Sequence, residues 1–240
     1  MTAVDARLLR HGGPPSAGRR VGALVLAAAA LIGCSNAPSE SSGAGHGQLR
    51  VVNGAVTPVA VWVDGFALYG ELAPGAISPP LPVAPGSRSV ELRPIGGSTN
   101  AATRVDVTAD SSLVVAALGT SAGSVSALAL ADTGAIPAPG TAKLQAVHLA
   151  AKAPAIWVWR KQPDFPTPVT FMFPHPYGMS TSYIQAPPGT WEVYVTPAGA
   201  PNATTNTLAH LSISIAANQA RRVAVLDSGS TVRIVPLDSP

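Results

Sequence analysis

The stretch LRVVNGAVTPVAVWV at residues 49–63 decides the fold, because the chain contains it twice. It aligns without a gap on LQAVHLAAKAPAIWVW at residues 144–159, which places Trp62 on Trp157. Two further segments repeat in the same order, APGSRSVELRPIGG at 84–97 on PPGTWEVYVTPAGA at 187–200 and LVVAALG at 113–119 on RRVAVLD at 221–227. The offset between the copies grows along the chain, so the second copy carries small loop insertions, one of them around residues 161–176. The sequence is therefore a tandem repeat.

Each copy consists of short runs of valine, leucine, isoleucine and alanine bounded by proline, glycine, asparagine and aspartate. These runs have the length of strands, and the repeated body shows no long helical period. The strands expected in the first copy are Leu49–Asn53, Val59–Asp64, Arg88–Pro94, Thr103–Thr108, Leu113–Leu118 and Ser124–Leu130. Asp64-Gly65 has the composition of a hairpin turn. The pattern predicts an all-β fold with two tandem immunoglobulin-like β-sandwich domains.

A glycine- and proline-rich segment, ADTGAIPAPGT at residues 131–141, separates the two copies. We therefore expect a first β-sandwich repeat over residues 48–138 and a second over residues 139–240. Each copy has about 95 residues, which is the size of one seven-stranded sandwich.

The repeated motifs LRVVNGAVTPVAVWVDG and VAPGSRSVELRP resemble the bacterial domain of unknown function 4397 family, which opens on VRVVHASPDAPAVDVYVDG. The resemblance implies tandem immunoglobulin-like domains in envelope proteins, and it implies no known chemistry. Both copies lack the Ser-Pro-Asp of the family's opening. In the second copy, Val158-Trp159-Arg160 replaces Val63-Asp64-Gly65, so we expect a different turn there.

The first 33 residues are expected to be a lipoprotein signal peptide. An apolar run from Val21 to Ile32 follows Arg19-Arg20, and as a helix it would span about 18 Å of a hydrocarbon core of roughly 30 Å. The run ends in Leu31-Ile32-Gly33-Cys34, which resembles the lipobox of bacterial lipoproteins. That resemblance implies cleavage between Gly33 and Cys34 and a lipid on Cys34, followed by a flexible tether over residues 34–47. We expect a protein anchored by lipid in the bacterial cell envelope, with the outer membrane favoured by Ser35 if the cell is Gram-negative.

The charge of the chain argues against nucleic acid as a partner. The sequence has 15 lysines and arginines against 12 acids, but residues 1–33 carry four arginines and one acid. The remaining chain holds as many basic as acidic residues, which leaves no basic surface for a phosphate backbone. A single cysteine excludes a disulfide framework and a cysteine-based zinc site, and the five histidines show no HxH or HExxH spacing. We expect no metal and no cofactor.

One segment has the form of a serine nucleophile elbow, Gly119-Thr120-Ser121-Ala122-Gly123. The repeat aligns Gly119 with Asp227, which places the segment in a loop after a strand, and a hydrolase at Ser121 would need a helix after Gly123. A serine hydrolase therefore stays a remote alternative, and we expect no enzyme. His148 takes the position of Asn53 in the first copy, so it is expected to form hydrogen bonds at the end of a strand.

Aromatic residues gather in the second copy, where nine of the twelve lie between residues 157 and 194. Within a strand, Trp157 and Trp159 lie on one face and Ile156 and Val158 on the other. Two interpretations remain open. In the first, the segment 157–194 contacts a partner protein or a glycan; the candidate surface residues are Trp159, Phe165, Phe171 and Tyr177. In the second, the protein is a structural spacer or assembly subunit of the envelope, and the aromatic residues only hold its two domains together.

Overall fold

The computed structural model describes residues 45–130, 135–162, 167–201 and 203–237. These ranges contain sixteen β-strands and no helix, and so no helix in them is long and apolar enough to cross a membrane. The described chain is all-β, as the sequence predicts.

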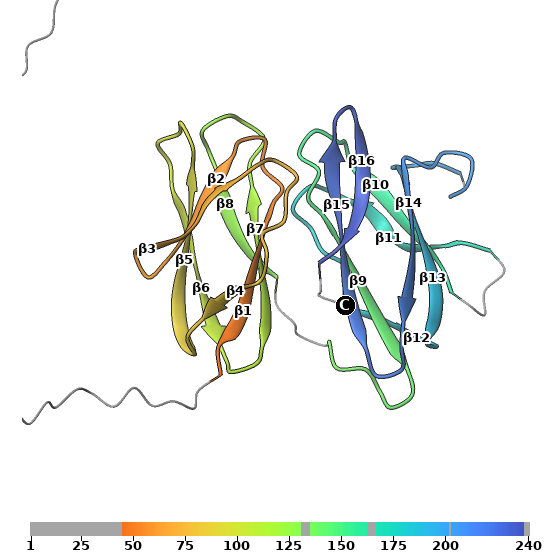
Figure 1. The fold of residues 1–240 in the computed structure, drawn as a ribbon. Coiled ribbons are helices and arrows are strands. Elements are labelled where there is room, and N and C mark those ends of the chain that lie inside the picture. Colours follow the sequence, from red (N-terminus) through yellow and green to blue (C-terminus); the bar gives the residue numbers. More distant parts are fainter. Residues whose placement is uncertain (1–44, 131–134, 163–166, 202, 238–240) are drawn as a thin grey trace, which may run out of the picture. The chain divides into compact units, whose positions relative to one another are not determined.

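The first half of the described chain forms two four-stranded sheets (Figure 1). Its strands are β1 (Gly47–Asn53), β2 (Val59–Val63), β3 (Phe66–Leu72), β4 (Leu81–Val83), β5 (Gly86–Pro94), β6 (Ala101–Val107), β7 (Ser112–Leu118) and β8 (Ser126–Leu130). One sheet has the order β4-β1-β7-β8 and the other has the order β3-β2-β5-β6. β1 lies between β4, to which it is antiparallel, and β7, to which it is parallel.

The second half repeats this topology strand for strand. Its strands are β9 (Ala142–His148), β10 (Ile156–Lys161), β11 (Val169–His175), β12 (Ile184–Ala186), β13 (Gly189–Pro197), β14 (Ala209–Ile215), β15 (Ala220–Ser228) and β16 (Thr231–Pro236). The sheets have the orders β12-β9-β15-β16 and β11-β10-β13-β14, and β9 pairs in parallel with β15 as β1 does with β7.

All six strands expected in the first copy are present, with ends shifted by one or two residues. The sequence reasoning missed β3 and β4. Both strands lie at the edge of their sheets, where only one neighbour constrains them. β3 reads FALYGEL and buries only Leu72 fully, and β4 is three residues long, so neither shows the alternation by which a strand is recognised.

The strand registers correct the alignment of the two copies. Val59 of β2 lies opposite Pro94, and Ile156 of β10 lies opposite Pro197, which is the repeat counterpart of Pro94. The counterpart of Trp62 is consequently Trp159, and the alignment of Trp62 with Trp157 is wrong by two positions. The loop between β9 and β10 is two residues longer than the loop between β1 and β2, and a gapless alignment cannot accommodate this difference.

Each half has an apolar core to which both of its sheets contribute. Fully buried residues of the first core include Val51, Val59, Val61, Val90, Leu92 and Val115. Fully buried residues of the second core include Leu144, Ile156, Trp191, Val193, Val195, Ile215 and Val223. Two sheets facing one core are consistent with a β-sandwich in each half.

Four strands are apolar on both faces. Val51 and Val115 belong to the first core, but their neighbours Val52 and Ala116, on the opposite faces of the same strands, belong to a third apolar cluster. That cluster also contains Val114, Leu130, Val147, Leu149, Ala224, Leu226 and Leu237, which come from both halves. Burial on both faces explains why parts of these strands, such as Val51-Val52 of β1, Leu113–Leu118 of β7 and Val223–Leu226 of β15, are apolar without alternation.

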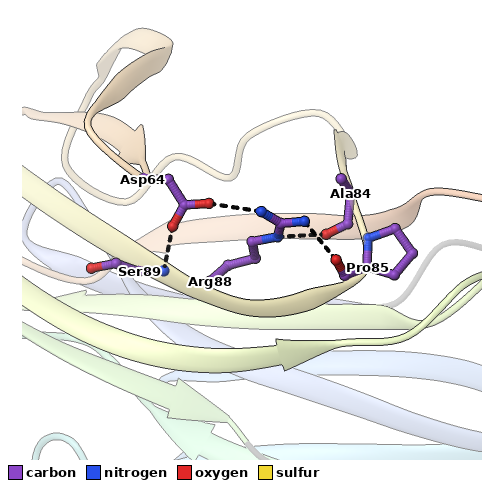
Figure 2. A network of polar contacts seen from close by, with 5 residues as sticks. All are labelled: Asp64, Ala84, Pro85, Arg88 and Ser89. Atoms are coloured by element: carbon purple, nitrogen blue, oxygen red, sulfur yellow. Dashed lines mark hydrogen bonds and ion pairs between the residues drawn. The ribbon is translucent and has the colours of Figure 1, made fainter. Parts of the chain in front are cut away.

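The turn after β2 is the hairpin predicted at Asp64-Gly65, and both residues have positive φ, 49° and 85°. Figure 2 shows that the Asp64 carboxylate accepts a hydrogen bond from the backbone N–H of Ser89 at 2.9 Å and pairs with Arg88 at 3.1 Å. Arg88 in turn donates to the carbonyl oxygens of Ala84 and Pro85. The hydrogen bond from Ser89, followed by Arg88, lowers the pKa of Asp64 below its usual value. This network fastens the β2–β3 turn to β5.

The residues at this turn differ in the second half, as the sequence predicts, but Arg160 and not Val158 takes the position of Val63, so the replacement of Val63-Asp64-Gly65 by Val158-Trp159-Arg160 is wrong. The strand registers place Lys161 and Gln162 at the positions of Asp64 and Gly65, and β11 begins only at Val169.

Candidate functional site

The outer face of the sheet β11-β10-β13-β14 carries a row of aromatic side chains that crosses three strands. Trp159 of β10 lies opposite Tyr194 of β13, and Tyr194 lies opposite His210 of β14. Trp157 lies two residues from Trp159 on the same face, because alternate residues of a strand share a face. We call these four residues, Trp157, Trp159, Tyr194 and His210, the aromatic stripe.

The stripe is built on a rigid support. The residues between its members point inward, and Ile156, Val158, Val193 and Val195 are at most 1% exposed. The rings of Trp157 and Trp159 lie 5.8 Å apart, and those of Tyr194 and His210 stack at 4.5 Å with an angle of 20° between their planes. The indole N–H of Trp159 donates to Thr196 Oγ1 at 2.9 Å, which fixes the orientation of the indole ring.

Polar groups lie along one side of the stripe. Glu192 accepts a hydrogen bond from Ser212 at its Oε1, at 2.9 Å, and its Oε2 contacts His210 Nε2 at 2.5 Å. The side chains of His210 and Glu192 are 45% and 26% exposed, so both reach solvent. Burial, followed by the charge of Glu192, raises the pKa of Tyr194, so its hydroxyl keeps its proton at neutral pH. Lys161 lies opposite Glu192 in the strand register. The face therefore combines aromatic rings with a carboxylate, a hydroxyl and an ammonium group.

The first half has no such stripe. The strand registers place Ala60, Trp62, Glu91, Arg93 and Ala102 at the positions of Trp157, Trp159, Tyr194, Thr196 and His210. Of these five residues only Trp62 is aromatic, and the guanidinium of Arg93 lies 3.7 Å above its ring. Arg93 is held there by Glu91 at 2.7 Å. Both copies thus have a tryptophan at this position, and in the first copy Arg93 covers it. The second copy has three further rings beside it, those of Trp157, Tyr194 and His210.

The candidate surface residues separate into three environments. Trp159 lies in the stripe. Phe171 is 6% exposed and belongs to the second core with Trp191, so its assignment to a surface is wrong. Tyr177 is part-buried, and its hydroxyl accepts a hydrogen bond from Gly119 N at 2.7 Å and donates one to Gly54 O at 2.8 Å, which is a structural role.

The remaining candidates, Phe165, Cys34 and Gly33, lie outside the described residues. Sequence reasoning missed Tyr194 and His210 as members of one face with Trp159. The signal was present, because GTWEVYVTP and AHLSISI alternate apolar and polar residues as strands with one exposed face do.

Ser121 is exposed in the loop after β7, and the chain continues from Gly123 into β8. In this described segment a loop and then β8 follow β7, and not the helix that a nucleophile elbow at Ser121 would need.

His148 lies at the end of β9 and is 1% exposed. Its Nδ1 accepts a hydrogen bond from Ala150 N, and its Nε2 contacts Pro154 O, both at 3.3 Å. Asn53 forms the same contacts in the first half, with Ala55 N and Thr57 O at 2.9 Å. The prediction of a hydrogen-bonding residue at a strand end is confirmed.

A cavity of about 280 Å³ lies at one end of the second half, lined among others by Lys152, Leu208, Asp227 and Thr231. Its carboxylate, Asp227, already accepts hydrogen bonds from the backbone N–H of Lys152 at 3.2 and 3.3 Å. Within the part of the chain that the structure describes, no three His, Cys, Asp or Glu side chains gather as metal ligands would. The stripe is therefore the stronger candidate.

Comparison with known proteins supports the family that the motifs suggest. Residues 47–159 match the family described as Domain of unknown function (DUF4397). No curated protein matches the chain. Among solved structures, the Bacillus anthracis TIE protein is similar at 12% identity and a TM-score of 0.26, over 80% of this chain and 34% of the other. A leucine-rich repeat protein from Bacteroides thetaiotaomicron VPI-5482 is similar at 12% identity and a TM-score of 0.21, over 74% of this chain and 25% of the other. The chain thus spans about a third and a quarter of these two structures.

Proposed function

We propose that this protein is a lipid-anchored component of the bacterial cell envelope, with two tandem immunoglobulin-like domains, and that it binds a partner protein or a glycan without catalysing a reaction. The anchor is Cys34, after cleavage of the signal peptide at Gly33, and the contact region is the aromatic stripe of the second domain.

The observation that carries the proposal is the difference between the two copies at one sheet position. Trp62 is covered by Arg93 at 3.7 Å, and the first-half counterparts of Trp157, Tyr194 and His210 are Ala60, Glu91 and Ala102, none of them aromatic. The second half places Trp157, Tyr194 and His210 around the counterpart of Trp62 on an outer sheet face. Partly exposed aromatic rings on a rigid support are typical of sites that bind partners.

Site-specific photo-crosslinking in intact cells tests this function. The full chain carries p-benzoylphenylalanine in place of Trp159, and the matched control carries it in place of Trp62. We expect a crosslinked product of higher mass from position 159 and none from position 62. Absence of a product at position 159, or equal products at both positions, contradicts the proposal.

A structural spacer is the second candidate, and Tyr177 favours it. The Tyr177 hydroxyl forms hydrogen bonds with Gly54 and Gly119 of the first half, which supports a role of this aromatic residue in holding the halves together. A spacer needs Tyr177 but has no use for Trp159. Loss of envelope integrity in cells that carry Tyr177→Phe, with intact envelopes in cells that carry Trp159→Ala, would favour the spacer.

Protease treatment of whole cells determines which side of the envelope the domains face. Cleavage of the wild-type protein on intact cells places them outside, and protection until the outer layer is opened places them in the periplasm. Cys34→Ala provides the unanchored control.

A further inference from the structure

We infer that the ligand of the aromatic stripe is a polysaccharide of uncharged pyranose rings, bound flat on the outer face of the sheet β11-β10-β13-β14. This inference rests on the proposed function and specifies its ligand class.

The rings of the stripe suit the apolar faces of sugars. The face of an aromatic ring carries partial negative charge, which attracts the C–H groups on the flat side of a pyranose. Trp159, Tyr194 and His210 lie opposite one another on three adjacent strands, and strands are spaced by about 4.8 Å. Trp157 extends the row along β10, with its ring 5.8 Å from that of Trp159. Tyr194 and His210 stack on each other at 4.5 Å and so leave one face each, which a chain of sugar rings can meet together with Trp157 and Trp159.

The polar groups beside the stripe suit sugar hydroxyls. Glu192 is a hydrogen-bond acceptor that Ser212 and His210 hold in place, and the protonated hydroxyl of Tyr194 both donates and accepts. Hydroxyl groups of a sugar need both kinds of partner. A carboxylate that is already oriented loses little side-chain freedom when it binds.

The charges of this face disfavour a charged polymer. Lys161 lies opposite Glu192 in the register, and the side chain of His210 contacts the same carboxylate. A polyanion would meet the carboxylate, and a polycation would meet the ammonium group, so neither gains a net attraction.

Few of the large exposed hydrophobic residues lie near the stripe. Large exposed hydrophobic residues of the described chain include Ile95, Ile136, Met179 and Leu208; Leu208 lies at the margin of the stripe, where its N–H donates to Val195 O. A partner strand cannot add at β10 or β13, because both are interior strands with both edges paired.

Affinity electrophoresis tests the inference. The full chain in a nonionic detergent is run in native gels that contain hydroxyethyl cellulose, glucomannan or xyloglucan as neutral probes, and alginate as an anionic probe. We expect retardation in at least one neutral gel and none in alginate. Trp159→Ala and Tyr194→Ala weaken the retardation at least tenfold, while Trp62→Ala, the matched control, leaves it unchanged.

Glu192→Gln serves as a second variant because it keeps the shape of the side chain and does not touch the core. It is expected to weaken retardation at least threefold, and thermal unfolding of each variant verifies that it folds. Retardation in no neutral gel, retardation only in alginate, or retardation that survives both Trp159→Ala and Glu192→Gln overturns the inference.

The two proposals fail in different ways. A protein crosslinked at position 159, together with no retardation in any neutral gel, overturns the polysaccharide and leaves the binding function standing. No crosslink at position 159 and no retardation overturns both.

Discussion

His148 offers a sharp test of the repeat, because the first half contains its natural replacement. In place of His148 the first half has Asn53, whose amide forms the same hydrogen bonds with a shorter side chain. His148→Asn should keep the acceptor for Ala150 N, and His148→Ala should remove it. Ala150 is fully buried, so its N–H cannot turn to water instead.

The magnitudes follow from burial. Leaving one buried N–H unpaired costs about 1–3 kcal/mol, and truncating a buried ring adds a cavity, so His148→Ala should lower the free energy of unfolding by about 2–4 kcal/mol. His148→Asn should lower it by less than about 1 kcal/mol at pH 8, where histidine is neutral.

The two variants should also differ in their response to acid. Burial is the main cause that lowers the pKa of His148, and burial also lowers the pKa of the neighbouring His175. Above the ordinary histidine pKa of about 6.5, both histidines are neutral in the folded and in the unfolded chain, so they do not reduce the free energy of unfolding. Below that value the unfolded chain takes up protons that the folded chain does not, so stability falls by up to about 1.4 kcal/mol per pH unit for each histidine. His148→Asn removes one of these two contributions and leaves that of His175.

Urea unfolding, followed by tryptophan fluorescence at pH 8 and pH 5.5, measures both effects. The wild type should lose more stability than His148→Asn between the two pH values. Equal losses would refute the assignment of the acid response to His148. A His148→Asn variant as unstable as His148→Ala would refute the equivalence of the two strand ends.

Three further outcomes are expected. Cys34→Ala should move the protein from the detergent phase to the aqueous phase in phase partitioning, and persistent detergent-phase recovery would contradict the lipid anchor. Phe171→Ala should cost about 3–5 kcal/mol in urea unfolding because the ring is buried, whereas Phe66→Ala, at a position 79% exposed, should change stability by less than about 0.5 kcal/mol. Asp64→Ala should lower the melting temperature at pH 7; because the folded pKa of Asp64 lies below 3.8, the difference from wild type should vanish as the pH falls through that lowered value.

The central strands could be predicted from the sequence because buried strands are rich in apolar residues. β1 and β7 bury apolar residues on both faces at Val51-Val52 and at Val114–Ala117, and this makes LRVVN and SLVVAAL stand out from their surroundings. The edge strands β6 and β8 were predicted as well, whereas β3 is mostly exposed and β4 has only three residues, so the sequence did not reveal these two.

The face of Trp159 was predicted correctly although its repeat partner was not. The segment Ile156–Arg160 reads IWVWR, so a shift of two positions brings one tryptophan onto the other. Because side chains alternate with a period of two, such a shift changes the partner of a residue and keeps its face. Only the pairing of β10 with β13 identifies the partner.

The high density of aromatic residues in the segment 157–194 could not show which of them are exposed and which are buried in the core. Phe171 lies on β11, whose pairing with β10 is interrupted by register shifts between Ile156 and Trp159. Such irregularities change which side chains point inward, and nothing in the local sequence signals them. The role of Tyr177 depends on Gly54 and Gly119, which are distant in sequence, so it too could be found only in three dimensions.

The position of β1 has a mechanical consequence. β1 is the first described strand, and it is held on both sides, by β7 from Gln48 to Asn53 and by β4 from Gly47 to Leu49. A force that pulls on the chain ahead of Gly47 acts along the strand, across hydrogen bonds that run between strands. The bonds on both sides then share the load together and do not open one after another. Tension arises when the chain is anchored ahead of Gly47 and the second half is bound to a large polymer. The fold would then resist this tension at β1.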